Sequence, residues 1–542
     1  MVRLRHGGQR LIKPASGGRV GFAAKPRPQS ESPATFPMEK RQTVIFLIDT
    51  QGANCVGCYR PDLALGTPHI DQLAAQGVRF DAAYTCAPVC GPARSALLTG
   101  LYPHSTGVLG NDMAPHLDIP TLGQRLRDRG FATGYVGKWH LDGSDYFGDG
   151  RCPQGWDPAY WMDGRNYLDS LPSDEARALS REVLAPKDVA AHGITAEFTH
   201  AWRVAERARE FIHANRDRDF LLVVSIDEPH HPYIAPEPYA SAFNDFLFPV
   251  PNADDPLVDK PGSQREWARH TAGHRAHLVR DGGVPSLRHP QHFGCNSFCD
   301  SQVGRVLQAI DAETPQALVI HTSDHGDMFG SHGLQGKGPC MYEEIVRIPF
   351  IVRCPGLTPA GAVSKAPISH IDVVPTLLDY FGLPLPELLQ GKSLLAQMRD
   401  PSHRTNEQVF LEFNRFEIDH DGFGAFAPTR TVFDGRYKLA INLLDTDELY
   451  DLSTDPLELR NRINDPSVVP QRERLLDALL AWMNRTRDPL RGPHWARRHW
   501  GTRGGSTWGG PTRPRPFDEA YYPKTLLYDT GKVIDRFEYL KH

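Results

Sequence analysis

The sequence predicts an α/β fold in which helices sandwich a large, mostly parallel sheet, and a smaller α/β domain on an antiparallel sheet follows. Two observations support this expectation. Continuous apolar runs, typical of strands buried on both faces, occur at 43–48, 220–225, 317–322 and 349–354. Segments with helical boundary signals lie between the first two runs, and strands that alternate with helices indicate a parallel sheet covered on both faces.

Two helices are expected between the first two strands, over 68–75 and 121–129. The first begins at Pro68 and is closed by Gly77, and the second is closed by Gly130 before the apolar text FATGYV. Proline at a helix start and glycine just beyond the end are common boundary residues, because proline loses no hydrogen bond in the first turn and glycine tolerates the closing turn.

Three regions differ in composition. Residues 1–37 carry seven Lys and Arg against one acid, Glu31, with many Gly, Pro and Ser. This composition predicts a disordered basic tail, or a start codon assigned too far upstream of Met38. Residues 38–400 hold the predicted strands and helices of the main domain. Residues 401–542 are expected to form the smaller domain, with a tail that wraps back over the body.

A predicted hairpin marks the smaller domain. Two strand-like runs in TRTVFDGRYKLAINLL flank Asp434-Gly435, and Asp-Gly between such runs is a strong signal of a hairpin turn. In the tail, Trp495, Trp500 and Trp508 are interleaved with Arg and His. Packing on their own domain is the favoured explanation, and a rim that stacks on sugars is the alternative.

Charge and hydropathy exclude several function classes. The chain has 60 basic and 65 acidic residues, a formal charge of −5, so no global positive field is available to bind nucleic acid or an anionic membrane. No apolar run approaches the roughly 20 residues that span a bilayer, and the N-terminus lacks the apolar segment of a secretory signal. We therefore expect a cytoplasmic protein with no nucleic-acid or membrane partner.

Cysteine usage points away from a disulfide framework. Nine cysteines lie at irregular spacing in a long chain, so most are expected to be reduced core residues. Cys55 and Cys58 form an isolated C-x-x-C, for which a buried structural pair is favoured over a redox or zinc site.

One cysteine lies in a specific motif. Cys90-Gly91-Pro92-Ala93-Arg94 is followed by SALLTG. Cys86 begins a similar C-x-P, but Cys90 occupies its fourth following position instead of an arginine. A lone cysteine before a helix is usually structural, whereas the complete motif resembles the C-x-P-x-R signature of the sulfatase family. The resemblance implies an alkaline phosphatase-like fold and a formylglycine nucleophile made from Cys90 by a formylglycine-generating enzyme.

The implied conversion of Cys90 suits ester hydrolysis. An aldehyde hydrate offers two geminal hydroxyls, one to attack sulfur or phosphorus and one to expel the bound ester as the aldehyde reforms. A thiol or a serine cannot release its product in that way. Arg94 would hold an oxygen of the hydrate, because its guanidinium is rigid and permanently charged.

The resemblance also implies a metal site at two strand ends. Asp49 follows the first predicted strand, and Asp324 and His325 follow the third, where the carboxyl ends of parallel strands gather. These residues match the metal-binding strand ends of sulfatases and imply one divalent cation. Carboxylate oxygens suit Ca²⁺ or Mg²⁺, with Ca²⁺ favoured, and the histidine leaves Mn²⁺ open. The commoner family pattern has a second acid at the position that Thr50 occupies here. The side-chain oxygen of Thr50 is therefore expected to serve as the ligand in place of a carboxylate.

Further segments imply the remaining site residues. Lys138 and His140 lie in Gly-Lys-Trp-His-Leu, which resembles a family segment that supplies an anion-binding lysine and a base for the formylglycine hydrate. His230 lies in Pro-His-His-Pro, which implies a role at the leaving group or the ester oxygens, with His231 local. Lys337 in Gly-Lys-Gly is the second anion-binding lysine. The similarity spans about 43–465.

The sequence therefore predicts a sulfatase that hydrolyses a small-molecule or glycan sulfate ester. A phosphonate monoester or phosphodiester hydrolase with the same aldehyde is the alternative, because sulfate and phosphate monoanions have similar shapes. An unmodified, inactive binding protein is a further alternative for a host that lacks the maturation enzyme. The same sequence is compatible with a homo-oligomer.

Overall fold

The computed structural model describes residues 40–271, 278–280, 282–417 and 426–501. It also gives the backbone of two short strands, β17 (Thr525–Leu526) and β18 (Val533–Ile534). The expected basic tail at 1–37 and the tail residue Trp508 lie outside the described residues.

A seven-stranded sheet forms the centre of the main domain, and of its strands only β10 runs antiparallel to its neighbours. The predicted mostly parallel sheet is thus confirmed, although the apolar run at 349–354 supplies the antiparallel member. In spatial order the strands are β11 (Ala362–Ser364), β2 (Val78–Phe80), β10 (Phe350–Arg353), β9 (Leu318–Ser323), β1 (Gln42–Ile48), β5 (Phe220–Ile226) and β4 (Ala132–Gly137).

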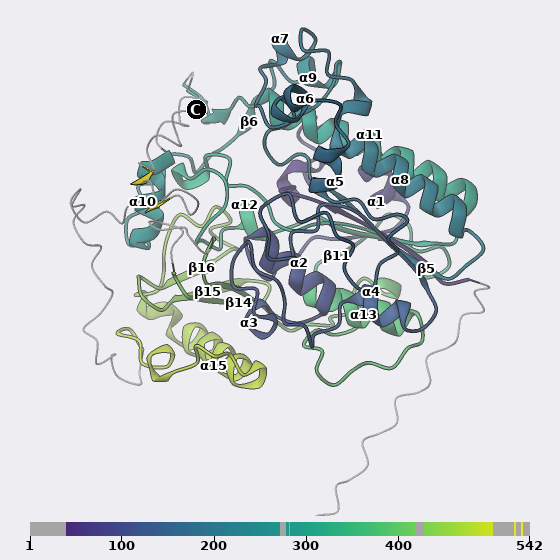
Figure 1. The fold of residues 1–542 in the computed structure, drawn as a ribbon. Helices are drawn as coiled ribbons and strands as arrows, with labels where there is room; N and C mark the ends of the chain where they lie inside the picture. The colour runs from purple at the N-terminus through teal and green to yellow at the C-terminus, as the bar shows by residue number, and fades with distance from the viewer. Residues whose placement is uncertain are drawn as a thin grey trace, which may run out of the picture. The chain divides into compact units, whose positions relative to one another are not determined.

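Helices cover both faces of this sheet (Figure 1). In β1, Val44 and Phe46 face one apolar cluster, and Ile45 and Leu47 face the other, so alternate side chains of one strand are buried on opposite sides. The first cluster packs against α1 (Pro68–Ala75), α8 (His200–Asn215) and α11 (Pro290–Glu313). The second packs against α2 (Cys90–Thr99), α4 (Leu122–Arg127), α13 (Val373–Tyr380) and α14 (Leu395–Arg399).

The C-terminal part is built on a four-stranded antiparallel sheet, as expected. The predicted turn at Asp434-Gly435 joins its second and third strands. One face packs on α15 (Val469–Thr486) and the other on the main domain through Leu411, Phe433 and Tyr450. The strands are β13 (Val409–Phe413), β14 (Thr429–Phe433), β15 (Tyr437–Asn442) and β16 (Glu448–Asp451).

Shorter elements fill the connections. The strands are β3 (Ala83–Tyr84), β6 (Phe248–Pro249), β7 (Leu278–Val279), β8 (Ser286–Leu287) and β12 (Ile368–Ser369). The helices are α3 (Pro103–Thr106), α5 (Gly164–Asp169), α6 (Asp174–Leu179), α7 (Pro186–Val189), α9 (Tyr239–Ala242), α10 (Gly262–His270) and α12 (Glu343–Val346). Among the helices of the described residues, none combines the length and apolar character required to cross a membrane.

The tail beyond α15 packs on the antiparallel sheet over its described length. Trp495 is fully buried in the cluster that α15 shares with this sheet. The Arg498 guanidinium donates to both carboxylate oxygens of Asp447, at 2.7 and 2.9 Å, and the Trp500 indole donates to the same side chain at 2.8 Å. For Trp495 and Trp500 the favoured packing explanation holds.

Trp482 of α15 should be a main anchor of the C-terminal part. Its ring is fully buried, stacks on Phe410 at 4.9 Å and meets the edge of Tyr102 from the main domain at 4.9 Å. Trp482→Ala should therefore lower the free energy of unfolding by about 3–5 kcal/mol, measured by urea unfolding. Leu459→Ala, at an exposed position, should change it by less than about 0.5 kcal/mol. Equal losses in both variants would contradict this account of the packing.

Candidate active site

The site lies where β1, β5 and β9 end. Asp49 directly follows β1 and Asp324 directly follows β9, and both carboxylates are fully buried. Asp49 Oδ2 accepts from Lys138 Nζ at 2.7 Å, and its Oδ1 accepts from the Thr50 hydroxyl at 2.5 Å. Asp324 Oδ1 accepts from the backbone amides of Thr50 at 3.1 Å and His325 at 2.9 Å. Two carboxylates therefore face one another in the interior at this edge of the sheet.

Arg94 joins these carboxylates. Its guanidinium donates to Asp324 Oδ2 at 2.9 Å and to Asp49 Oδ2 at 3.0 Å, and its third nitrogen donates to the Lys138 carbonyl and the Ser225 hydroxyl, each at 2.8 Å. A planar guanidinium suits such divergent contacts because its donors have fixed directions. Burial opposes ionisation of Asp49, but Lys138 and the other nearby cations hold the pKa of its carboxyl well below the usual range.

Cys90 is the first residue of α2, and its side chain is fully buried. Its Sγ accepts from Lys337 Nζ at 2.6 Å and lies 3.1 Å from His325 Nε2. Burial and Asp49 raise the pKa of the thiol, whereas Lys337, Lys138 and His325 lower it, and the net pKa is well below its ordinary value. Position 90 is therefore an electropositive place for a nucleophile.

Gly137 ends β4 and places Lys138 beside Asp49. Its φ is +105°, and a Cβ here would lie 1.7 Å from the Ser225 carbonyl oxygen, so only glycine fits this close approach. Lys138 Nζ then reaches Asp49 and, at 3.0 Å, Asp227. Two residues further on, His140 Nε2 lies 3.4 Å from Asp112 Oδ1, while its Nδ1 has no hydrogen-bond partner in the described part of the chain.

His230 and Lys337 complete the set of predicted residues. Lys337 Nζ lies 3.4 Å from His230 Nε2 and 3.3 Å from His325 Nε2. His230 Nδ1 lies 2.9 Å from the Tyr146 hydroxyl. The structure thus brings the predicted site residues together at this edge of the sheet.

Sequence reasoning missed Tyr146, Asp227 and Asp112. Asp227 directly follows β5, so the rule that functional groups gather at strand ends could have found it. Tyr146 and Asp112 lie in irregular loops, where the sequence carries no pattern that marks them. Gln51, next to the predicted ligand Thr50, turns away: its amide contacts Asn296 at 2.7 Å and His321 at 2.9 Å.

The cluster contains a donor set that fits a divalent cation. Ligand atoms of Asp49, Cys90, Asp324 and His325 all lie within 4.8 Å of one another. Two carboxylates and an imidazole suit a hard or borderline cation. The Thr50 oxygen lies beside Asp49, so it is close enough to the set to act as a further donor.

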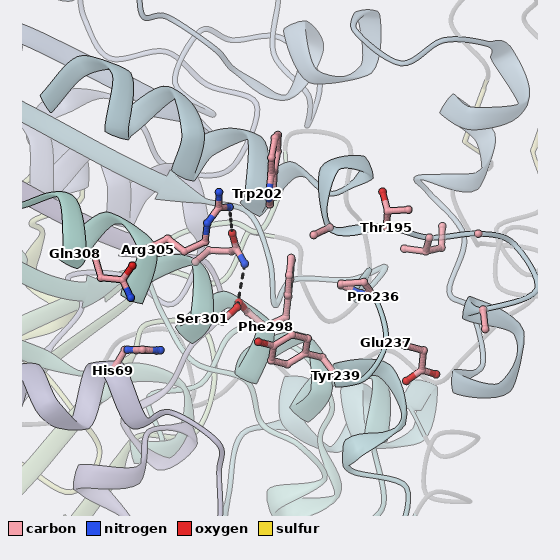
Figure 2. A pocket seen from close by; sticks show the side chains of 15 residues that line it. His69, Thr195, Trp202, Pro236, Glu237, Tyr239, Phe298, Ser301, Arg305 and Gln308 are labelled. Atoms are coloured by element: carbon pink, nitrogen blue, oxygen red, sulfur yellow. Dashed lines mark hydrogen bonds between the residues drawn. The ribbon is translucent and has the colours of Figure 1, made fainter. Parts of the chain in front are cut away.

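A hollow of about 840 Å³ lies elsewhere, among α1, α8, α9 and α11. Figure 2 shows Trp202 and Arg305 on one side of it and Tyr239 and Phe298 on the other. None of the predicted site residues lines this hollow. It is therefore separate from the candidate active site.

The fold and the cluster define the class of protein. A mostly parallel sheet with helices on both faces carries, at its carboxyl edge, a cysteine at a helix start, paired carboxylates and two lysines that contact them or the cysteine. This combination is that of hydrolases of the alkaline phosphatase superfamily.

Comparisons with known proteins define the family. The model of the Sulfatase family matches residues 41–383, and the model described as N-sulphoglucosamine sulphohydrolase, C-terminal, matches residues 330–485. The chain belongs to the sulfatase family and is a sulfuric ester hydrolase.

Individual relatives agree with this assignment. The chain is 43% identical over 499 residues to "Uncharacterized sulfatase YidJ" of Escherichia coli, covering 91% of this chain and 97% of that protein. It is 28% identical over 422 residues to choline-sulfatase of Rhizobium meliloti, covering 74% and 78%. The structure of a phosphonate monoester hydrolase from Silicibacter pomeroyi has the same fold, with a TM-score of 0.69, 22% identity and coverage of 83% and 96%.

Arg94 should be needed for folding as well as for the site. Arg94→Ala leaves two buried carboxylates without their shared cation, which should lower the free energy of unfolding by about 3–5 kcal/mol. Arg94→Lys keeps the positive charge but lacks the planar guanidinium that contacts both carboxylates, so it should lower the free energy of unfolding by less than Arg94→Ala does. Arg280→Ala removes a surface pair with Asp254 and should cost about 0–1 kcal/mol. Urea unfolding measures all three, and a wild-type midpoint for Arg94→Ala would rule out this pairing.

Proposed function

We propose that the protein hydrolyses sulfate esters through a formylglycine at position 90 with the help of one divalent cation. The single observation that supports this most strongly is the surroundings of Cys90. The cysteine of the C-x-P-x-R motif begins a helix within 2.6 Å of Lys337 Nζ and 3.1 Å of His325 Nε2, and its Sγ lies within 4.8 Å of ligand atoms of both buried carboxylates.

The cation would be held by Asp49, Asp324, His325 and the oxygen of Thr50. Ca²⁺ suits the carboxylates best, and Mg²⁺ or Mn²⁺ also fits this donor set. When bound, such a cation lowers the pKa of a hydroxyl that it contacts and orients the ester oxygens. Arg94 bridges the two carboxylates and offsets part of their negative charge, although burial and Asp49 raise the pKa of Asp324 above its ordinary value.

The aldehyde hydrate at position 90 would supply two hydroxyls, one to attack the sulfur atom and one to expel the sulfate as the aldehyde reforms. Lys138, which is buried, and Lys337, which is partly buried, would bind the negative oxygens of the ester. His140 would take a proton from the hydrate, since it lies in the same cluster and its Nδ1 is unpaired among the described residues. His230 would act at the leaving group or at the ester oxygens.

The organic part of the substrate is proposed only as a class. A small-molecule or glycan sulfate ester is in keeping with the sulfatase relatives, among them a choline-sulfatase. Hydrolysis of phosphonate monoesters or phosphodiesters is the second candidate, supported by the fold shared with a phosphonate monoester hydrolase. A panel of sulfate esters, sulfated sugars and phosphodiesters assayed on matured protein decides between them.

Further proposals follow from the sequence. Residues 38–400 would form the catalytic domain and residues 401–542 the smaller domain with its tail. A formylglycine-generating enzyme would act on the chain during maturation, in a cytoplasmic location. An unmodified, inactive binding protein is the remaining alternative, for a host that lacks the maturation enzyme.

The mass of residue 90 provides the first test. Matured protein should show there the mass loss expected when CH₂–SH becomes an aldehyde, measured by mass spectrometry of the peptide. Cys90→Ala should abolish hydrolysis. Cys90→Ser keeps one hydroxyl that can attack but cannot expel the product, so it should accumulate a sulfated serine.

Cys86→Ser is the matched control for the loss of a thiol. Cys86 is buried and its Sγ contacts the Ser369 hydroxyl at 3.2 Å, outside the cluster, so turnover should stay close to that of the wild type. A free Cys90 thiol in fully active protein would disprove the formylglycine mechanism.

Metal removal provides the second test. Exhaustive chelation should abolish turnover, and add-back of Ca²⁺, Mg²⁺ and Mn²⁺ in turn should identify the cation that restores it. Asp324→Ala should lose turnover and bound metal, measured by elemental analysis. Asp311→Ala is the control, because Asp311 is half exposed and pairs with Arg353. Full activity of metal-free protein would contradict the proposal.

A further inference from the structure

Tyr146 lies in the loop at 141–150, which the structure ties down at several points. Asp142 accepts from the backbone amides of Ser144 at 3.0 Å and Asp149 at 2.8 Å. Asp163 accepts from the amide of Gly150 at 2.9 Å, and the amide of Arg165 donates to a carbonyl of the same loop at 2.7 Å. These acidic side chains are therefore used as anchors for the loop, and the loop carries Tyr146 to a defined place.

The Tyr146 side chain meets three charged or titratable groups of the active site. Its hydroxyl donates to Asp227 Oδ1 at 2.5 Å, accepts from Lys138 Nζ at 2.8 Å and lies 2.9 Å from His230 Nδ1. Lys138 Nζ also lies 4.0 Å from the centre of the phenol ring, and the ring of His140 lies 5.5 Å away, edge to face. Tyr146 is thus in contact with Lys138 and His230, two of the side chains that are proposed to act on the ester.

The hydrogen bonds of the Tyr146 hydroxyl determine which ring nitrogen of His230 carries the proton. A phenol has one proton to donate and two lone pairs, and its proton is used by Asp227. Burial and Asp227 raise the pKa of Tyr146 well above its ordinary value, so the phenol keeps that proton. His230 Nδ1 must therefore be the donor in its contact with Tyr146, and also in its contact with the His231 carbonyl oxygen at 2.9 Å.

The opposite nitrogen of His230 then carries the lone pair. Burial, together with Lys138 and Lys337, holds the pKa of His230 well below its ordinary value, so the resting imidazole is neutral. Its Nε2 faces Lys337 Nζ at 3.4 Å. The charged or titratable groups that face His230 are Lys138, Lys337, Asp49, His231 and, through Tyr146, Asp227.

We propose that Tyr146 is a positioning residue that links Asp227 to His230 and holds Lys138 and His230 in their working orientations. The proposal rests on the function proposed above for these two side chains. Asp227 polarises the phenol, the phenol oxygen accepts the Nδ1 proton of His230, and the Nε2 lone pair is thereby directed toward Lys337. The same oxygen holds the Lys138 ammonium group between Asp49 and Asp227. A partner that orients a functional histidine through its second nitrogen acts in this way in many enzymes.

Tyr146→Phe tests the proposal with the loss of one oxygen atom. We expect kcat/KM on an aryl sulfate to fall about 10–100-fold, the usual effect of removing an orienting partner, with metal content and formylglycine content unchanged. Loss of the acceptor disfavours the charged imidazole, so the limb of the pH–rate profile that reports His230 should move to lower pH. A purely structural tyrosine would change neither the profile nor the activity per folded molecule.

Tyr167→Phe is the matched control. Its hydroxyl donates to the Phe198 carbonyl oxygen at 2.9 Å, and its ring also lies near a histidine, His200, but it touches none of the predicted site residues. The control should lose stability to a similar degree while keeping kcat/KM and the pH profile of the wild type. Wild-type kcat/KM and profile in Tyr146→Phe would overturn the proposal.

Nitrogen NMR of ¹⁵N-histidine-labelled protein gives a readout that needs no turnover. His230 is identified by the signals lost in His230→Gln. The wild type should show a protonated Nδ1 and an unprotonated Nε2, and Tyr146→Phe should titrate at lower pH. A proton on Nε2 in the neutral wild-type ring would overturn the proposal even if the enzyme is active. If no ester is hydrolysed but the tautomer is as stated, the proposed function fails while the positioning of His230 stands.

Discussion

The buried contact of Arg94 with Asp49 and Asp324 is the interaction on which the rest of the site depends. Two carboxylates that end neighbouring strands would repel one another in a dry interior, and the cost of such unpaired buried charges is large. One guanidinium from the first turns of α2 compensates both and also binds the Lys138 backbone. The same contact fixes the start of α2, and with it Cys90, against the carboxyl edge of the sheet.

The positive charge of Arg94, Lys138 and Lys337 exceeds the negative charge of Asp49 and Asp324. Lys138 is buried and Lys337 is partly buried beside Cys90 and the carboxylates, so the cluster carries fixed positive charge before any ligand arrives. Asp227 offsets part of this positive charge, because its carboxylate pairs with Lys138 at 3.0 Å. The Tyr146 hydroxyl accepts from the same ammonium group at 2.8 Å. The site is therefore a set of mutually compensating charges, in which each group depends on its neighbours for its protonation state.

The C-terminal sheet supports the same arrangement from outside. Its inner face packs on residues near α2 and α12, and the amide of Asn111 donates to the Phe416 carbonyl at 2.8 Å while Asn111 Oδ1 accepts from Gly91 at 2.9 Å. The loop after β13 is thus joined, through one asparagine, to the turn that carries Cys90. The smaller domain therefore contributes to the position of Cys90 as well as to stability.

The sequence by itself determined the buried strands, the hairpin at Asp434-Gly435 and the short motifs around Cys90, because hydrophobic period and local turn chemistry are properties of neighbouring residues. The short strand β2, the edge strand β11 and the antiparallel direction of β10 depend on contacts across the sheet and carry no local signal. Only the tertiary structure decided that Gln51 turns away from the site and that Tyr146 enters it. Partners of a loop side chain are set by the path of the whole chain, and that path is fixed by distant contacts that no window of sequence contains.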